Sequence, residues 1–216
     1  MKRILTALVA LSLLALGTTP VQADITPFLN NITGSAGNWT WTYHAELSAA
    51  QELRSDHTLS LVGVETSTKM GIKTGTYQDF FTIYDFVGFI PGSNTQPANW
   101  SFQSLDEGTT PGSVLPGDDP EIPNLTWWWT GPKVTGPVEV ANGLGLFTAK
   151  SIYGVVHLGD FAADATKHDP VNVNIDGMVQ QTVGSVSVPT VPEPSTFVLL
   201  GAGLIGAVAM RRRARK

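Results

Sequence analysis

The sequence predicts an all-β protein, a single β-sandwich of the jelly-roll or immunoglobulin-like kind, flanked by an N-terminal signal peptide and a C-terminal hydrophobic helix. Two observations favour the sandwich. Short runs of alternating or wholly apolar residues recur through the middle of the chain, and Gly, Pro, Asn and Asp separate them. This stretch also lacks a convincing internal repeat. Residues 24–190 are therefore expected to form one exported domain.

The clearest predicted strands are rich in aromatic residues. Residues 39–43 alternate aromatic with polar side chains, which places the aromatic rings on one face of a strand. Residues 80–90 are almost wholly apolar, as in a strand buried on both faces, and residues 106–123 predict a long Gly/Pro/Asp loop. Further strands are predicted at 58–64, 100–102, 125–130, 144–149, 151–158 and 183–188.

Three segments carry more specific predictions. Residues 45–54 have helix-forming composition, but they suit a strand followed by a turn equally well. Residues 171–179 contain Asp176-Gly177, a pair typical of a type I′ turn, and so predict a hairpin. Residues 161–166 predict a loop or one helical turn.

Charge is unevenly distributed along the 216 residues, whose formal net charge is −5. All 18 acidic residues lie between Asp24 and Glu193 beside six basic ones, so this stretch carries a formal charge of −12. A nucleic-acid-binding protein needs a basic stripe to displace counterions from phosphates, so we exclude this class. The chain contains no cysteine, which excludes a disulfide scaffold, a thiolate metal site and a cysteine nucleophile.

The N-terminus has the pattern of a secretory signal peptide. Lys2 and Arg3 precede an apolar run at 4–16, and small residues then predict cleavage between Ala23 and Asp24. As a helix, this run would rise about 20 Å, which is short of the ~30 Å hydrocarbon core. Sec-dependent export with removal by signal peptidase is therefore favoured over an uncleaved anchor.

The C-terminal residues 191–216 fall into three blocks. Pro192-Glu193-Pro194 predicts an extended, exposed strip, because proline neither continues a helix nor donates to a sheet ladder. The uncharged, Gly-rich residues 197–210 predict a transmembrane helix, which rises only about 21 Å and so needs flanking residues or local thinning of the bilayer. The final block is a basic tail, which places the C-terminus in the cytoplasm. Its basic residues are Arg211, Arg212, Arg213, Arg215 and Lys216.

These three blocks, behind an N-terminal signal peptide, resemble the PEP-CTERM sorting signal of Gram-negative bacteria. The resemblance covers about residues 191–216, with Pro192, Glu193 and Pro194 as the sorting motif. It implies an exosortase, a membrane-embedded peptidase or transpeptidase, as the processing partner. It also implies transient anchoring in the inner membrane, then delivery to the cell surface or extracellular matrix beside biofilm exopolysaccharide. The alternative is an ordinary single-pass anchor with a proline-rich stalk.

Two features of the middle stretch are candidate binding sites. Trp127 and Trp129 share one face of a predicted strand, where exposed indole rings would stack on sugars; the alternative is that they fill the core. Asp118, Asp119 and Glu121 gather three carboxylates on a loop and form a candidate Ca²⁺ site. Their spacing lacks the EF-hand pattern, and a solvated acidic loop is the alternative.

No motif indicates catalysis or a resident cofactor, and we assign no catalytic residue. The histidine spacing does not match a zinc site, although Asp160, Asp164 and His168 would share a face of a helix. Neither a GxSxG elbow nor a GxGxxG or Walker loop is present. The leading hypothesis is a non-enzymatic structural or adhesive surface protein associated with exopolysaccharide. A carbohydrate-binding module using exposed tryptophans and a secreted hydrolase with an unrecognised site are the alternatives.

Overall fold

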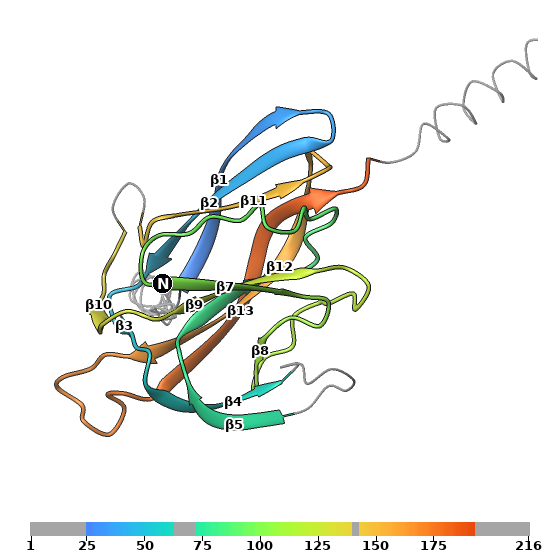
Figure 1. Ribbon diagram of the computed structural model, residues 1–216. Helices are drawn as coiled ribbons and strands as arrows, with labels where there is room; N and C mark the ends of the chain where they lie inside the picture. Colours follow the sequence, from blue (N-terminus) through green and yellow to red (C-terminus); the bar gives the residue numbers. More distant parts are fainter. Residues whose placement is uncertain (1–24, 63–71, 140–142, 193–216) are drawn as a thin grey trace, which may run out of the picture.

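The computed structural model describes residues 25–62, 72–139 and 143–192, which form antiparallel β-sheets without a helix (Figure 1). The predicted all-β sandwich is confirmed. In this part of the chain, no helix is long and apolar enough to cross a membrane. The cleavage site at Ala23 and Asp24, the predicted span at 197–210 and the basic tail lie outside the described residues.

Three sheets are present among the described residues. In spatial order, the first contains β1 (Ile25–Ser35), β2 (Asn38–Leu47) and β11 (Leu146–Ser151). The second contains β10 (Val134–Thr135), β3 (Gln51–Leu53), β12 (Val155–Lys167), β6 (Phe80–Ile83), β9 (Asn124–Trp129) and β7 (Trp100–Leu105), with β13 (Val179–Thr190) paired to β12. The third contains β5 (Ile72–Tyr77), β4 (His57–Val62) and β8 (Thr110–Pro111).

Strand β1 was not predicted from the sequence. It forms the edge of the first sheet and pairs with β2 along its length, with a bulge between Leu29 and Asn31. Pro27 lies within β1, and proline is tolerated there because an edge strand leaves one row of N–H groups outside the ladder. The pattern of β1 is also weakly alternating, since most of its residues after Pro27 are half-buried or exposed.

The core lies between the first and second sheets. Trp41 and Tyr43 of β2 are fully buried on one face, as their alternation predicts. Phe147 of β11 meets the second sheet edge-on, with its ring 5.0 Å from Phe81 and 5.6 Å from Trp127. Aromatic side chains that bury large areas dominate the energetics of such cores. This contact joins the two sheets into one hydrophobic cluster.

Strands β12 and β13 form a long antiparallel ribbon that crosses the molecule (Figure 1). The prediction of a loop or helical turn at 161–166 is wrong, because β12 runs through this segment. Its residues Phe161–Asp164 pair with β6 on one side while β13 pairs along the other. Two-sided pairing outweighs the helix propensity of the buried Ala162, Ala163 and Ala165.

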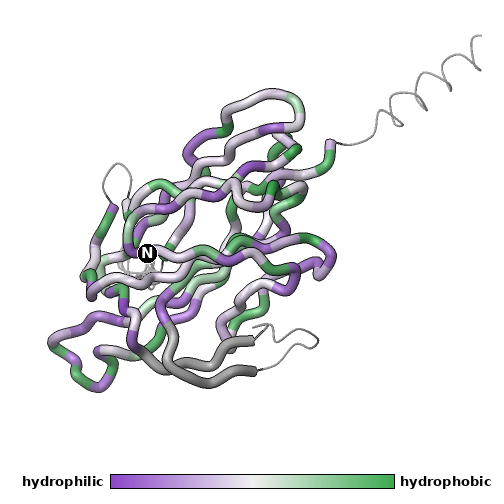
Figure 2. Tube along the Cα trace, viewed as in Figure 1, coloured by the Kyte–Doolittle hydropathy of each residue, from purple (hydrophilic) through white to green (hydrophobic). Residues whose placement is uncertain are grey.

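Two segments, 45–54 and 168–178, test the turns that the sequence predicts. For residues 45–54 the helix alternative is wrong and the strand-and-turn alternative is correct, since β2 ends at Leu47 and β3 begins at Gln51. The predicted hairpin around Asp176-Gly177 is wrong, because 168–178 is a loop that joins β12 to β13. The alternating valines of this loop, Val171 and Val173, are 92% and 80% exposed. In Figure 2 the loop that joins β12 to β13 alternates between hydrophilic and hydrophobic stretches. Alternation indicates a strand only where a neighbouring strand covers one face.

We predict that Phe147→Ala destabilises the fold by about 3–5 kcal/mol, because it leaves a cavity between the two sheets. The free energy of unfolding from urea titration measures this change. Val173→Ala, at an exposed position, is the control and should shift stability by less than about 0.5 kcal/mol. Equal effects of the two substitutions would show that the sheets do not share this core.

Candidate functional site

One buried amide anchors the acidic loop at 106–123. Asn124, the first residue of β9, is fully buried. Its Nδ2 donates to the carbonyl oxygen of Asp106 at 3.0 Å and to Oδ1 of Asp118 at 2.8 Å. Its Oδ1 accepts from the backbone N–H of Asp85 at 2.8 Å. A single side chain therefore ties both arms of the loop to the segment that follows β6.

The backbone leaves the strand conformation directly after β6. The apolar run at 80–90 predicts a long strand, but β6 ends at Ile83, so this prediction is too long. Asp85 adopts a φ of +53°, a left-handed conformation that leaves the strand region. Its carboxylate consequently turns toward the acidic loop, where its Oδ1 accepts from the backbone N–H of Asp119 at 2.9 Å.

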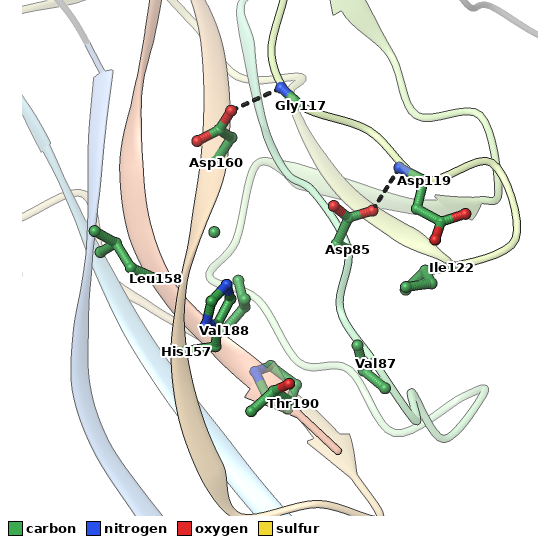
Figure 3. Close-up of a pocket in the computed structure, with 12 residues that line it drawn as sticks. Asp85, Val87, Gly117, Asp119, Ile122, His157, Leu158, Asp160, Val188 and Thr190 are labelled. Carbon is green, nitrogen blue, oxygen red and sulfur yellow. Dashed lines mark hydrogen bonds between the residues drawn. The ribbon is translucent and has the colours of Figure 1, made fainter. Parts of the chain in front are cut away.

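A pocket of about 360 Å³ lies where the acidic loop meets the ribbon of β12 and β13 (Figure 3). Asp160 of β12 and Asp85 flank it, and the loop residues Gly117 and Asp119 cross between them (Figure 3). Oδ2 of Asp160 accepts from the backbone N–H of Gly117 at 2.7 Å. The volume falls within the ~300–1,000 Å³ range of ligand sites.

The pocket combines an acidic rim with an apolar wall. Leu158 and Val188 belong to its lining, together with the exposed imidazole of His157 (Figure 3). Burial raises the pKa of Asp85, and the nearby charges of Asp119 and Asp160 raise it further. Such a site favours hydrogen-bond donors and positive charge over anions.

The candidate calcium ligands, Asp118, Asp119 and Glu121, lie on the acidic loop. Oδ1 of Asp118 accepts from Asn124, and Oδ1 of Asp119 accepts from the backbone N–H of Glu121 at 3.0 Å. Burial raises the pKa of Asp118, and the charges of Asp85, Glu107 and Asp119 act in the same direction. In the described residues these three side chains do not form a compact set of ligand atoms. Calcium binding by Asp118, Asp119 and Glu121 stays a prediction.

The assignment of Trp127 and Trp129 to an exposed sugar-stacking face is wrong. Trp127 is fully buried and Trp129 is 6% exposed. The ring of Trp127 stacks on Phe81 at 5.1 Å, and that of Trp129 packs on Trp100 at 5.3 Å. The predicted alternation is correct, but the face that they share is the core face. The alternative prediction, that Trp127 and Trp129 fill the core, is correct.

Asp160, Asp164 and His168, which would share one face of a helix, lie in three different environments. Asp160 lines the acidic pocket, Asp164 is fully buried in the second sheet, and His168 lies beyond the end of β12 against Glu52. They share no site because the segment is a strand. The pocket residues Asp85 and His157 were not predicted, since strands far apart in the sequence bring them together. The one feature of the sequence that could have indicated Asp85 is that its charge interrupts the apolar run.

A buried carboxylate pair lies in the second sheet. Asp79 and Asp164 are both fully buried. Asp79 accepts from the backbone N–H of Arg54 at 2.5 Å and from Oγ1 of Thr166 at 3.2 Å. Burial raises the pKa of Asp79 well above its usual value, and the charge of Asp164 raises it further. Asp164 accepts from the side-chain amide of Gln181 at 3.2 Å.

The described residues form an all-β domain, and the sorting signal is identified by its C-terminal sequence. Residues 190–213 match the family model of the PEP-CTERM protein-sorting motif, as the resemblance indicated. The chain therefore carries this sorting motif, which implies export through the membrane and processing by an exosortase. No curated protein and no solved structure is significantly similar to the chain. The match begins at Thr190, the last residue of β13.

We predict that Asp79→Asn changes the pH dependence of stability. A raised pKa means that the folded chain holds a proton that the unfolded chain has lost. The contribution of Asp79 to wild-type stability therefore falls as pH rises above ~4, the pKa of an unperturbed aspartate, by up to about 1.4 kcal/mol per pH unit. The amide that replaces this carboxyl does not titrate, so the variant gains stability relative to wild type as pH rises above ~4.

Urea unfolding at several pH values measures this difference. Glu121→Gln removes an exposed carboxylate and is the control, expected to follow the wild-type profile. If Asp79→Asn and Glu121→Gln have parallel profiles, the buried carboxyl does not hold the extra proton.

Proposed function

We propose that this exosortase-sorted protein acts at the cell surface or in the extracellular matrix as a structural or adhesive component in contact with biofilm exopolysaccharide. The proposal depends mainly on one observation, the sorting motif at 190–213. In this proposal the β-sandwich contributes binding surface and performs no catalysis. No resident cofactor is required for that role.

The position of the motif supports this role. The ladder of β12 and β13 ends where Val155 pairs with Thr190, and Val191 and Pro192 beyond it are exposed. Proline lacks the N–H that would extend the ladder. The sorting-motif match therefore overlaps the sheet only at Thr190, and Pro192 lies beyond the ladder, where a processing enzyme reaches it without unfolding the core.

The acidic pocket supports the contact with polysaccharide. Carboxylate oxygens accept hydrogen bonds from sugar hydroxyls, and the half-buried Val87 and Ile122 add apolar surface to the pocket lining (Figure 3). Asp85 and Asp160 each use one oxygen in the backbone contacts described above. Among the described residues no hydrogen bond is seen to the second oxygen of either carboxylate, which is therefore available to a ligand. This pocket replaces the buried tryptophans as the candidate glycan contact.

We predict that the mature surface form lacks both terminal signals. Intact-mass measurement of the protein from the cell surface should exclude residues 1–23 and the basic tail at 211–216. In cells without exosortase activity, the tail should remain and the protein should stay in the membrane fraction. A surface form that retains 211–216 would contradict the processing step and favour an ordinary single-pass anchor.

We predict that the surface form co-sediments with the producing cells' exopolysaccharide and that Asp119→Asn with His157→Ala weakens this binding at least ~10-fold. The reason is that Asp119→Asn exchanges one charged acceptor oxygen for an amide donor and His157→Ala removes the imidazole, each change costing about 1 kcal/mol or more in a hydrogen bond to a sugar. Glu139→Gln removes an exposed carboxylate that does not line the pocket and is the matched control. Binding unchanged in the pocket variant would remove this pocket from the proposal, and no binding in any form would contradict the polysaccharide contact.

A further inference from the structure

A second polar cluster lies outside the acidic pocket, between strand β3 and the loop at 168–178. Glu52 of β3, His168 and Asp176 bring one ligand atom each to within 4.8 Å of one another. The three side chains differ in exposure, at 2%, 27% and 40% respectively. A carboxylate as deeply buried as Glu52 requires a cationic partner, because isolated buried charge is costly.

The local fold holds these three residues in place. Thr166 of β12 pairs with Glu52, and the backbone N–H of His168 donates to the carbonyl oxygen of Ala50 at 2.9 Å. The loop then returns, because the N–H of Gly177 donates to the carbonyl oxygen of Lys167 at 2.9 Å. Asp176 is fixed from the other side, since its Oδ1 accepts from the backbone N–H of Asp169 at 2.8 Å.

Two of the three distances between ligand atoms are close to those around a tetrahedral metal ion, and the third lies within 4.8 Å. Nδ1 of His168 lies 3.2 Å from Oε2 of Glu52 and 3.6 Å from Oδ1 of Asp176. Zn²⁺ binds nitrogen and oxygen ligands at ~2.0–2.2 Å, which separates neighbouring ligand atoms by roughly 3.3–3.6 Å. Within the described part of the chain, Nδ1 of His168 has no hydrogen-bond partner, whereas Oε2 of Glu52 is held in an ion pair by Lys133. Nδ1 of His168 is therefore available as a ligand, and Oε2 of Glu52 becomes available when this ion pair opens.

Two cationic side chains already contact Glu52. The ammonium group of Lys133 forms an ion pair with Oε2 of Glu52, and the guanidinium of Arg54 lies 3.9 Å from Oε1. The side chain of Lys133 is 52% exposed and has a long flexible stem. It can move into solvent, whereas Glu52 cannot. Lys133 therefore competes with a metal ion for Oε2.

We propose that Glu52, His168 and Asp176 form a Zn²⁺ site that fastens the loop at 168–178 to strand β3. Imidazole nitrogen with two carboxylate oxygens is a ligand set that Zn²⁺ accepts, and the fourth position is left to water because the cluster opens to solvent at Asp176. The sequence did not indicate this site, because Glu52 is distant from the other two ligands along the chain.

The test uses the full chain in detergent, treated with EDTA and dialysed, with ZnCl₂ as the probe. We expect isothermal titration calorimetry to show one Zn²⁺ per chain and the thermal midpoint to rise on binding. His168→Ala and Asp176→Asn should each weaken binding at least ~10-fold, since loss of even an outer-shell partner costs 10–100-fold. Asp176 lies on an exposed loop, so its variant is expected to fold.

Two further variants separate a metal site from an ion-pair network. Lys133→Met removes the competing ammonium and should strengthen Zn²⁺ binding several-fold. His44→Ala is the matched control, because His44 lies 3.5 Å from the single carboxylate of Glu46, and it should bind Zn²⁺ as the wild type does. Absence of stoichiometric binding, or equal binding by the His168→Ala, Asp176→Asn and His44→Ala variants, would overturn the proposal.

Discussion

The contact of Phe147 with the second sheet is the interaction on which the rest of the structure depends. Its ring lies edge-on to Phe81, Trp100 and Trp127, at 5.0–5.6 Å between centroids. Edge-to-face packing places the positive ring edge against a negative ring face, which adds to the gain from burial. A chain without disulfides has no covalent link between its sheets. Aromatic packing therefore supplies the connection that cross-links provide in many exported domains.

Buried polar groups then position the loops around this core. Asn124 holds the acidic loop, and Thr82 donates to the carbonyl oxygen of Thr109 at 2.7 Å. Tyr84 hydrogen-bonds the same carbonyl at 3.0 Å. Each bond satisfies a group that would otherwise cost free energy when buried. The pocket between the acidic loop and the ribbon is thus built on fixed backbone, although its rim belongs to a long loop.

The sorting motif and the folded domain meet at a sharp boundary. The last ladder pair of the ribbon involves Thr190, and the sorting-motif match starts at that residue. The core aromatic residues all lie before this point. Removal of the C-terminal segment therefore takes nothing from the cluster that stabilises the sandwich. Thr190 also lines the acidic pocket, so cleavage beyond this residue leaves the pocket lining complete.

The sequence alone determined the fold class, the sorting motif and the alternation of the aromatic strands. These are local properties, since periodicity, proline placement and charge order can be read within a few residues. It did not determine which face of the strand at 127–129 is buried. Side chains alternate between the two faces of a strand, and this alternation does not indicate which face meets the core. Nor did the sequence indicate that Asp85 would meet Asp160, or Glu52 would meet His168. Only the tertiary structure decided these pairings, because antiparallel register brings together residues that are remote along the chain.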